Sequence, residues 1–460
     1  MTSVPPQIRD LAARYTEAWC SHDPARVAGF FSPIGSLRIN NGAWVHGRHG
    51  IAEVTSGLMH AFPDMQVRMD GLVVQHNRVV YRWTMLGAHS GDQQLGAHSD
   101  AHSETASGVF GGAHRVRISG FEEWELDFDG LISEAQRHYD NAVWQHQVQY
   151  GSLAPRFFDE DEVRARLRMP ELIDAMERAL VEFSAGDVRQ PVRAVLEFGA
   201  ERSLFGLMPS YVPSLPALGA KLVTVCAGNA GRGLDAHQAV IVMLNPVTGV
   251  AEAVLDGRYI TAIRTAAVSA VSVRLLARSD SKVLGILGSG VQARSHLEAL
   301  KLARDFSEVR VWSPNAERLQ QFAAETRARA MENAEAVVRG ADVVVAATAS
   351  PTPVIQSDWV DDGAHVIAVG ACLPSQRELD PLLVARARLV VDSREAALKE
   401  AGDVVIGIAE GRWTKEHISA ELGELPVRRN DREVTVFKSL GLAVEDLFAA
   451  HLVLTHAGRV

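Results

Sequence analysis

Hydrophobic and polar positions change their period along the chain and divide it into three regions. The first region, residues 1 to about 150, opens with an amphipathic helical pattern over 8–31 and continues with strand-like runs. Those runs cover 72–86, 114–130 and 132–148. A charged connector over 154–180, with acids near a helix start, leads into a long amphipathic helix. From residue 282 onward, apolar runs alternate with helical stretches, which predicts a parallel, doubly wound sheet.

A glycine motif opens the third region. Gly288-x-Gly290-x-x-Ala293 follows an apolar run and begins a helical stretch. Its glycines let the backbone turn sharply and approach a pyrophosphate, whose charge the helix amides stabilise. This context predicts a dinucleotide site that includes Ser289 and Gln292, and the alternative is a structural glycine turn.

The end of the next apolar run bears on the choice between NAD and NADP. NAD sites usually place an acid there for the ribose 2′-hydroxyl, and that acid would repel a 2′-phosphate. Ser313 and Asn315 stand in that place, with Arg318 one helical turn further on. The missing acid favours NADP, while the lack of an arginine directly at the turn leaves NAD open.

Three cations precede the glycine motif in otherwise apolar stretches. Arg193 and Lys221 lie in strand-like runs, and Arg264 lies in a helix of small residues that supplies no acid locally. One such cation alone is more often a surface residue with a buried stem, or the partner of a structural acid. Three together indicate a shared anion, with arginine making bidentate contacts to a carboxylate.

Composition narrows the class of protein. The 460 residues are 47% hydrophobic and 22% charged with a formal net charge of −10, so neither a nucleic-acid nor a membrane partner is expected. No window is expected to span a bilayer, and the first residues lack a signal-peptide pattern. Cys20, Cys226 and Cys372 lie far apart, which favours a reducing cytoplasm over a disulfide or zinc framework.

Histidine is frequent within one Gly-, Ser- and Ala-rich stretch over 87–114. The residues concerned are His89, His98, His102 and His114. Their spacing matches no familiar ligand pattern, so a solvated loop is favoured over a metal site and no metal is expected.

The first region resembles the SnoaL-like, polyketide-cyclase-type branch of the NTF2-like fold. The matching pieces are "AFPDMQV", "GAHSG", "DGLISEAQRHYD" and "VWQHQVQYG". The resemblance implies an α+β cone in which helices close over a curved sheet and leave a pocket. His138 and Asp140 are candidate acid/base groups at its mouth, but the favoured interpretation is that Asp140 ends a strand and His138 forms a polar wall.

From about residue 162 the chain resembles the ornithine cyclodeaminase/mu-crystallin family, with wording most like its mu-crystallin branch. The matching phrases include "QPVRAV", "KLVTV", "DGRYITAIRTAAVSA", "LGSGVQARSH", "GAHVIAVGACLPSQRELD" and "TVFKSLGLAVEDLFAA". The resemblance implies an α/β Rossmann domain over 281–431, inserted in an α+β substrate and dimerisation domain over 151–280 that 432–460 rejoin. Residues 1–150 form the NTF2-like domain. A homodimer is implied.

The resemblance also assigns residues. Those at the positions of Arg193, Lys221 and Arg264 hold the substrate carboxylate beside the nicotinamide in that family. The implied cofactor contacts beyond the glycine motif are Ala347, Thr348, Val369, Gly370 and Ser439.

Two departures from the family pattern refine the prediction. Members that use NADPH carry Asn-Arg-Thr at the second strand, whereas here Pro314 replaces the arginine. Cyclodeaminases place an aspartate where this chain has Cys372, and a neutral thiol replaces a carboxylate poorly in proton transfer. Cys372 is therefore interpreted as a packing residue at the substrate pocket.

The sequence thus predicts an NAD(P)H-dependent reductase of an imine or ketimine next to a carboxylate, or the reverse amino-acid dehydrogenase reaction. A redox-neutral ornithine cyclodeaminase with bound NAD remains an alternative. A non-catalytic protein that binds a small ligand is the other.

Overall fold

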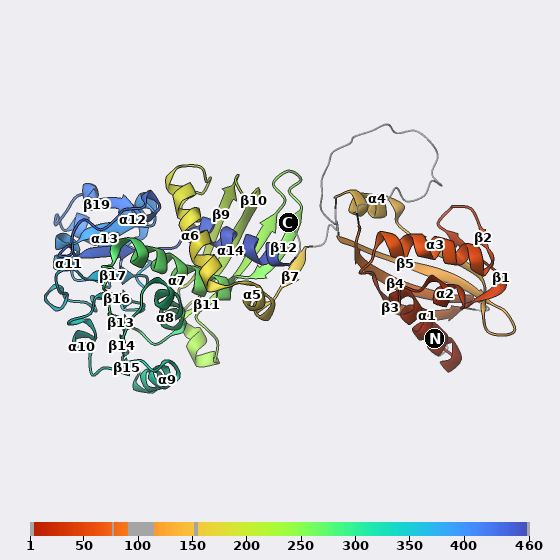
Figure 1. The fold of residues 1–460 in the computed structure, drawn as a ribbon, viewed down its shortest axis with the longest axis horizontal. Helices are drawn as coiled ribbons and strands as arrows, with labels where there is room; N and C mark the ends of the chain where they lie inside the picture. Colours follow the sequence, from red (N-terminus) through yellow and green to blue (C-terminus); the bar gives the residue numbers. More distant parts are fainter. Residues whose placement is uncertain (1–3, 76–77, 91–114, 151–154, 458–460) are drawn as a thin grey trace. The chain divides into compact units, whose positions relative to one another are not determined.

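The computed structural model describes residues 4–75, 78–90, 115–150 and 155–457, which form two compact units (Figure 1). One unit comprises the chain up to Pro155, and the other extends from Arg156. The division agrees with the change of sequence pattern after residue 150.

The first unit is a six-stranded sheet in the order β2-β1-β6-β5-β4-β3 with helices packed against it. β1 pairs with β6 in parallel, and the other pairs are antiparallel. Its elements are α1 (Pro6–Cys20), α2 (Pro24–Ala28), β1 (Phe31–Ile39), β2 (Val45–His46), α3 (Gly47–Ala61), β3 (Gln66–Gln75), β4 (Arg78–Ala88), β5 (Arg115–Leu126), β6 (Ile132–Tyr139) and α4 (Asn141–Tyr150).

Two predicted elements of this unit are divided in the structure. The helical pattern over 8–31 breaks because His22 has a φ of 53° and Asp23 then caps α2 by accepting from the Ala25 amide at 2.9 Å. The strand-like run over 132–148 is a strand only as far as β6. Asp140 accepts from the amides at the start of α4, so the remaining residues are helical.

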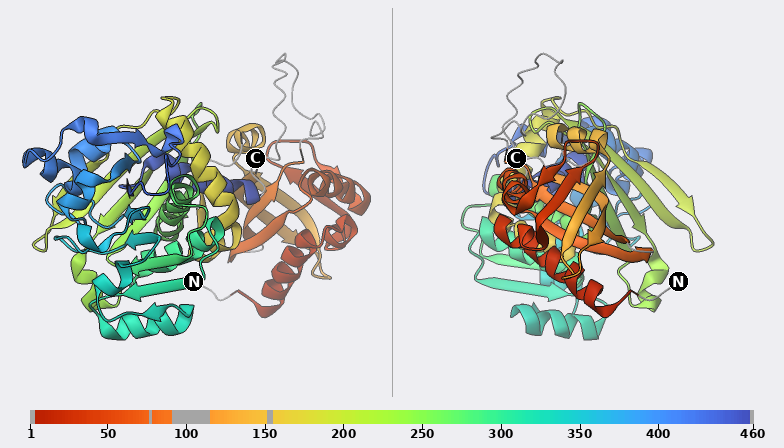
Figure 2. Two further views of the ribbon diagram at one scale, coloured as in Figure 1. Left: turned by 60° about the vertical axis from the view of Figure 1, so that its left-hand side comes forward. Right: turned by 90° about the vertical axis from the view of Figure 1, so that its right-hand side faces the viewer.

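The second unit contains two sheets (Figure 2). One is six-stranded in the order β7-β12-β11-β10-β9-β8, antiparallel except where β7 pairs with β12. Its elements and the helices before the second sheet are β7 (Arg156–Phe158), α5 (Glu160–Arg166), α6 (Met169–Ser184), β8 (Ala194–Phe198), β9 (Ser203–Val212), β10 (Ala217–Val225), η1 (Ala227–Arg232), β11 (His237–Leu244), β12 (Ala251–Asp256) and α7 (Gly257–Leu276).

The other sheet has eight parallel strands in the order β15-β14-β13-β16-β17-β20-β18-β19. Its elements are β13 (Val283–Leu287), α8 (Val291–Ala303), β14 (Glu308–Trp312), α9 (Ala316–Thr326), β15 (Arg329–Ala330), α10 (Ala334–Val338), β16 (Val343–Ala346), η2 (Ser357–Trp359), β17 (His365–Ala368), α11 (Pro381–Arg386), β18 (Arg388–Val391), α12 (Arg394–Glu400), α13 (Gly402–Ala409), η3 (Lys415–His417), β19 (Ile418–Glu421), η4 (Leu422–Glu424) and β20 (Thr435–Lys438). The predicted parallel, doubly wound sheet is confirmed.

Both faces of the parallel sheet are buried. Along β16, Val343 and Val345 belong to one hydrophobic core, whereas Val344 and Ala346 belong to another. A strand covered on both sides has no polar face, which explains its continuous apolar sequence.

The chain rejoins the six-stranded sheet later than the sequence suggested. The return was placed at residue 432, but β20 is a strand of the parallel sheet between β17 and β18. Helix α14 (Ala443–His456) is the element that packs against β9, β10 and β11.

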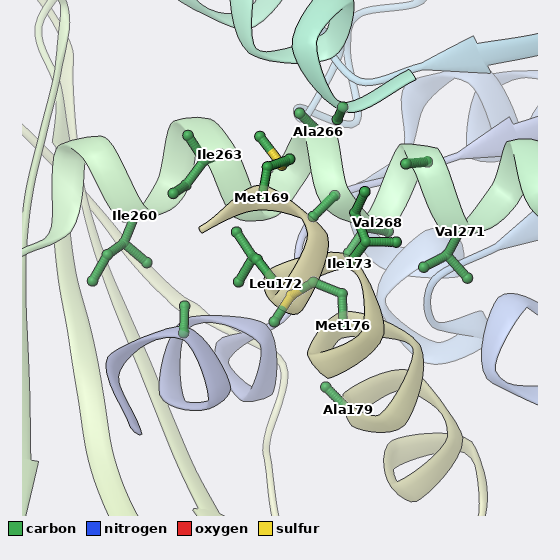
Figure 3. Packing of buried hydrophobic residues seen from close by; sticks show 14 of the residues in the cluster. Met169, Leu172, Ile173, Met176, Ala179, Ile260, Ile263, Ala266, Val268 and Val271 are labelled. Atoms are coloured by element: carbon green, nitrogen blue, oxygen red, sulfur yellow. The ribbon is translucent and has the colours of Figure 1, made fainter. Parts of the chain in front are cut away.

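Helices α6 and α7 form the centre of the larger core. Met169, Leu172 and Met176 of α6 pack near Ile260 and Ile263 of α7 (Figure 3). Contrary to expectation, α7 is long and apolar enough by length and composition to cross a membrane. However, 83% of its most apolar window is buried inside the protein, and core helices have the same composition.

A buried ion pair stabilises the first unit. Glu122 is 0% exposed and accepts from Arg137 Nε at 2.7 Å, from Tyr15 Oη at 3.0 Å and from Trp124 Nε1 at 2.9 Å. Arg137 also lies 4.2 Å from the ring centre of Trp19. These contacts satisfy a carboxylate that β5 carries into the core.

We expect Glu122→Gln to destabilise the first unit by about 3–5 kcal/mol, because Arg137 would keep a buried charge without its partner. The matched control is Glu125→Gln on the same strand, whose pair with Arg78 is largely exposed, and little change is expected there. Urea unfolding followed by tryptophan fluorescence measures both. Equal effects of the two substitutions would contradict the structural role of Glu122.

Candidate active site

The glycine turn after β13 fits a pyrophosphate. Gly288 has a φ of 113°, and a Cβ there would lie 2.4 Å from the carbonyl oxygen of Ala347. Gly290 is the N-cap of α8 and makes no side-chain cap, and a Cβ there would have no atom of the described protein within 4 Å. The first amides of α8 therefore adjoin open space, as an anion site at a helix N-terminus requires.

The neighbouring side chains agree with this arrangement. Ala293 is fully buried and lets α8 pack closely on the sheet, while Ser289 is 6% exposed. The Gln292 carbonyl oxygen lies 2.7 Å from His296 Nδ1. Gln292 Oε1 is buried without a hydrogen-bond partner among the described residues, so this loop has polar capacity that a ligand can use.

Glu378 ties together the two loops that follow β16 and β17. Its Oε1 accepts from the Thr348 amide at 3.1 Å and the Thr348 hydroxyl at 2.7 Å, and its Oε2 accepts from the amides of Gly370 at 2.7 Å and Ala371 at 2.9 Å. A Cβ on Gly370 would lie 1.8 Å from the Thr348 carbonyl oxygen. One buried carboxylate therefore sets the approach of both loops at the carboxyl edge of the sheet. Burial raises its pKa.

After β14, the polar side chain of Asn315 contacts the start of the next helix, α9. Asn315 caps α9 by accepting from the Arg318 amide at 2.9 Å. Ser313 is 9% exposed, whereas Arg318 is exposed. Pro314 separates these polar residues at the turn where a ribose would be recognised.

Two of the three predicted cations meet at one buried carboxylate. Lys221 on β10 places its Nζ 2.7 Å from Asp446 Oδ2. Arg264 on α7 donates from Nε to Asp446 Oδ1 at 3.1 Å and from Nη1 to Glu445 Oε2 at 2.8 Å. Both cations are under 5% exposed. The acids come from α14, so Arg264 has structural partners that its own helix does not supply.

Arg193 joins the same cluster through the chain before α14. Its Nη2 donates to the carbonyl oxygens of Leu440 and Gly441 at 2.8 and 2.9 Å, and its Nε lies 3.1 Å from Glu400 Oε2. Gly441 lies against Arg264, because a Cβ there would be 2.3 Å from Arg264 Nη1. The three cations predicted from the sequence therefore lie in one cluster, each paired with an acid.

Burial and mutual repulsion adjust the charges in this site. Burial and then Arg264 lower the pKa of Lys221 to about 8, against the opposing attraction of Asp446. Burial raises the pKa of Glu445 to about 7. Burial followed by Lys221 and Arg264 lowers the pKa of His237, on β11, to about 4. His237 is an ionisable neighbour that sequence analysis did not identify.

Buried acids hold the chain between β20 and α14 in place. Asp392 Oδ2 accepts from the Gly441 amide at 2.7 Å and from the Ser439 hydroxyl at 3.3 Å. Lys438 is fully buried, with its Nζ 3.2 Å from Asp403 Oδ2. Asp392 and Asp403 were not predicted, because Lys438, Ser439 and Gly441 follow them by 35 residues or more.

Cys372 follows β17 and is partly buried. Its Sγ lies 3.5 Å from the Val369 carbonyl oxygen, and burial raises the pKa of its thiol. A thiol in this state is neutral, which supports its interpretation as a packing residue. Asp380 caps α11 by accepting from the Leu382 amide at 3.0 Å.

The first unit contains a cavity of about 900 Å³. Arg137, Trp19, Trp83 and Tyr139 are among its lining residues. His138 is not, because successive residues of β6 face opposite sides of the sheet. With Asp140 it lines an adjoining pocket, which shares Tyr139 with the cavity, and its ring stacks on Phe121 at 4.8 Å.

The contacts of the two residues proposed for that domain favour structural roles. Asp140 is occupied as the cap of α4, and His138 Nε2 lies 3.9 Å from Glu123 Oε2. Arg137 and Glu53 are the charged residues among those that line the cavity. For Arg137, strand alternation was the one signal in the sequence.

No described group of three or more histidines, cysteines or acids is arranged to hold a metal ion. His89 lies within the described residues and is 7% exposed. His98, His102 and His114 lie outside the described residues.

The parallel sheet, the glycine turn and the buried cation cluster define a Rossmann-type α/β protein with a second, antiparallel sheet beside it. The chain belongs to the ornithine cyclodeaminase/mu-crystallin family, whose profile matches residues 155–458. The profile of the SnoaL-like domain matches residues 12–135. Both resemblances seen in the sequence are confirmed.

Individual relatives agree with this assignment. Ketimine reductase mu-crystallin of Rattus norvegicus is 44% identical over 309 residues, which cover 65% of this chain and 96% of the relative. The structure of Thermococcus litoralis Δ1-pyrroline-2-carboxylate reductase in complex with NADH and L-proline is 35% identical with a TM-score of 0.64, over 66% of this chain and 97% of that one. An archaeal alanine dehydrogenase dimer with bound NAD is 31% identical with a TM-score of 0.63, over 66% and 96%.

We expect Glu378→Gln to destabilise the second unit by about 2–3 kcal/mol, because an amide nitrogen would face backbone donors that now share a carboxylate. Glu395→Gln, at an exposed pair with Lys399, is the control and should change little. Chemical unfolding followed by circular dichroism measures both. An unchanged midpoint in the Glu378 variant would show that the loops hold their positions without it.

Proposed function

We propose that the chain is an NAD(P)H-dependent reductase of a carbon–nitrogen double bond next to a carboxylate, able to run the reverse amino-acid oxidation. The observation that carries the proposal is the cluster of buried Lys221 and Arg264 with the partly buried Arg193. The same chain also carries the glycine turn of Gly288 and Gly290. The names of two relatives, a ketimine reductase and a pyrroline-2-carboxylate reductase, support the substrate class. Cyclic ketimine acids and imines of 2-oxo acids with amines are candidates.

The residues present fit a nicotinamide dinucleotide. Its pyrophosphate would lie on the turn of Gly288 and Gly290, while Thr348, Gly370 and Ser439 would follow it towards the nicotinamide. When bound, the cofactor supplies the hydride. Ala347 and Val369 would complete the wall of the cofactor site.

The three cations would have different roles toward the substrate. Arg193 and Arg264 would hold the substrate carboxylate, and the fixed charges would need no reorganisation during the reaction. Lys221, with its pKa near 8, is largely protonated at neutral pH and would give a proton to the imine nitrogen. Its short contact to Asp446 would hold the ammonium nitrogen in place.

Cys372 separates this proposal from ornithine cyclodeamination. That reaction needs a carboxylate near the substrate nitrogen, and the thiol here is neutral. Glu378 does not replace it, because its oxygens are occupied by the two cofactor-side loops. A non-catalytic binding protein remains the second alternative, and retention of all three cations argues against it.

For the cofactor we propose NADP over NAD, with both accepted. The turn after β14 carries no acid to repel a 2′-phosphate, and Arg318 is exposed one turn into α9. Pro314 supplies no charge, so the preference is expected to be small.

We also propose a homodimer through the six-stranded sheet. Strand pairing places Leu196, Phe198, Leu207 and Val240 on the face opposite Lys221, and all four are at least 39% exposed. An apolar sheet face of this kind indicates a protein partner, and the archaeal alanine dehydrogenase is a dimer by its description. A second copy of this chain is the simplest partner.

The first test follows the loss of reduced-nicotinamide absorbance with Δ1-pyrroline-2-carboxylate, using NADH and NADPH separately. We expect turnover with both and a modestly larger kcat/KM for NADPH. Lys221→Met should lower kcat by about 10²-fold or more, while Lys399→Met, at an exposed site, should not.

Other outcomes would favour the alternatives. Ammonia release from ornithine without net cofactor change would establish a cyclodeaminase. Tight cofactor binding without turnover of imines or ornithine would favour a binding protein. Cofactor binding by Lys221→Met, measured by fluorescence, shows whether that variant is folded.

Light scattering tests the dimer. We expect the parent chain to have twice its monomer mass and Leu196→Glu to shift it towards the monomer, because a charge would be buried at the interface. Val247→Glu is the control, since Val247 is 91% exposed in a turn. A monomeric parent chain would refute the proposal.

A further inference from the structure

One carboxylate lies between two cations of the proposed site. Asp446 is fully buried, and its two oxygens contact different elements: Oδ2 is 2.7 Å from Lys221 Nζ on β10, and Oδ1 is 3.1 Å from Arg264 Nε on α7. Because a carboxylate is rigid, this arrangement fixes the ammonium group relative to the guanidinium group. Among the described residues, Asp446 is the acid that forms an ion pair with Lys221.

We infer that Asp446 is the positioning residue for proton transfer: it keeps Lys221 protonated and holds its Nζ at a fixed place beside the cation that would bind the substrate carboxylate. The inference rests on the proposed function, since it requires Lys221 to be the proton donor. Asp446 itself need not touch the substrate.

The surroundings of Lys221 explain why it needs this partner. Burial disfavours its charge, and both Arg264 and Arg193 repel it. His237 on β11 is neutral near pH 7, because burial and the nearby cations lower its pKa to about 4. Asp446 thus supplies the attraction that offsets burial and two like charges.

Glu445, the neighbouring acid on α14, forms an ion pair with Arg264 instead of Lys221. Its Oε2 lies 2.8 Å from Arg264 Nη1, and burial raises its pKa to about 7. For Asp446, burial acts in the same direction, but Lys221 and Arg264 outweigh it and lower the pKa below the usual range. Asp446 therefore stays ionised over the pH range in which Glu445 gains a proton.

Reduction of the imine transfers one hydride and one proton to the substrate. In imine reduction the substrate carbon takes the hydride that the nicotinamide cofactor supplies, and the substrate nitrogen takes a proton from Lys221 Nζ. One ammonium N–H bond breaks, one substrate N–H bond forms, and Lys221 becomes a neutral amine that regains a proton from water before the next turnover. Asp446 neither gives nor takes a proton.

The test is the pH dependence of single-turnover hydride transfer in the full chain, with NADPH and Δ1-pyrroline-2-carboxylate. In the parent enzyme the rate should fall as the pH rises through about 8, where Lys221 loses its proton. In Asp446→Asn this midpoint should fall by ~1–3 pH units. The variant should be about fivefold slower or worse at pH 8, and its ratio to the parent should recover as the pH is lowered.

Control variants separate this role from a structural one. Asp174→Asn, at a side chain that is 73% exposed, should leave the profile unchanged. Glu445→Gln should keep the midpoint near 8, because the contact between Lys221 and Asp446 remains. A midpoint that moves in Glu445→Gln instead of Asp446→Asn would overturn the inference, as would an Asp446→Asn rate that is equally reduced at every pH.

If Asp446→Asn does not fold, as thermal unfolding would show, Asp446→Glu replaces it. This variant keeps the charge, so its midpoint should stay within about one pH unit of the parent. A larger fall would contradict the inference. Absence of hydride transfer in the parent enzyme would refute the proposed function, whereas an unshifted midpoint in an active Asp446→Asn refutes only this step.

Discussion

The ion pairs of Asp446 with Lys221 and Arg264 are the interaction on which the second unit depends. They join β10, α7 and α14, three elements that belong to different parts of the chain. Two cations under 5% exposed are tolerable only because acids from α14 accompany them. Since α14 follows β20 of the parallel sheet directly, the same helix links the two sheets. The same ion pairs therefore stabilise the second unit and arrange its site.

A second carboxylate has a comparable role on the cofactor side. Glu378 joins the loops after β16 and β17, as Asp446 joins the cations. Glu378 accepts hydrogen bonds from both loops, whereas Asp446 accepts from Arg264 through Oδ1 and forms an ion pair with Lys221 through Oδ2. Desolvation of such a group is costly, and these hydrogen bonds and ion pairs offset that cost. The acids thereby set positions without reacting.

The spacing of apolar and polar residues predicted those parts of the fold that neighbouring residues determine. The alternation of apolar runs and helices indicated the parallel sheet, and the turn at Gly288 and Gly290 indicated a nucleotide site. It could not pair Arg264 with Glu445 and Asp446, because those acids lie 181 and 182 residues away and read as a helix start. Arg137 and Glu122 lie only 15 residues apart, but they were missed because their pairing depends on the register of β5 and β6. Asp140 directly follows β6, as the favoured interpretation expected, and its additional role as the cap of α4 was missed because a strand end and a helix cap look alike in sequence.

The position of α14 has a consequence during synthesis. The carboxylate that neutralises Arg264 is made 182 residues after it, which at usual translation rates is a delay of roughly 10–40 s. Throughout that interval the growing chain carries two cations destined for burial that cannot yet be desolvated at acceptable cost. The nascent second unit must therefore stay open, or hold these side chains in water, until α14 emerges from the ribosome.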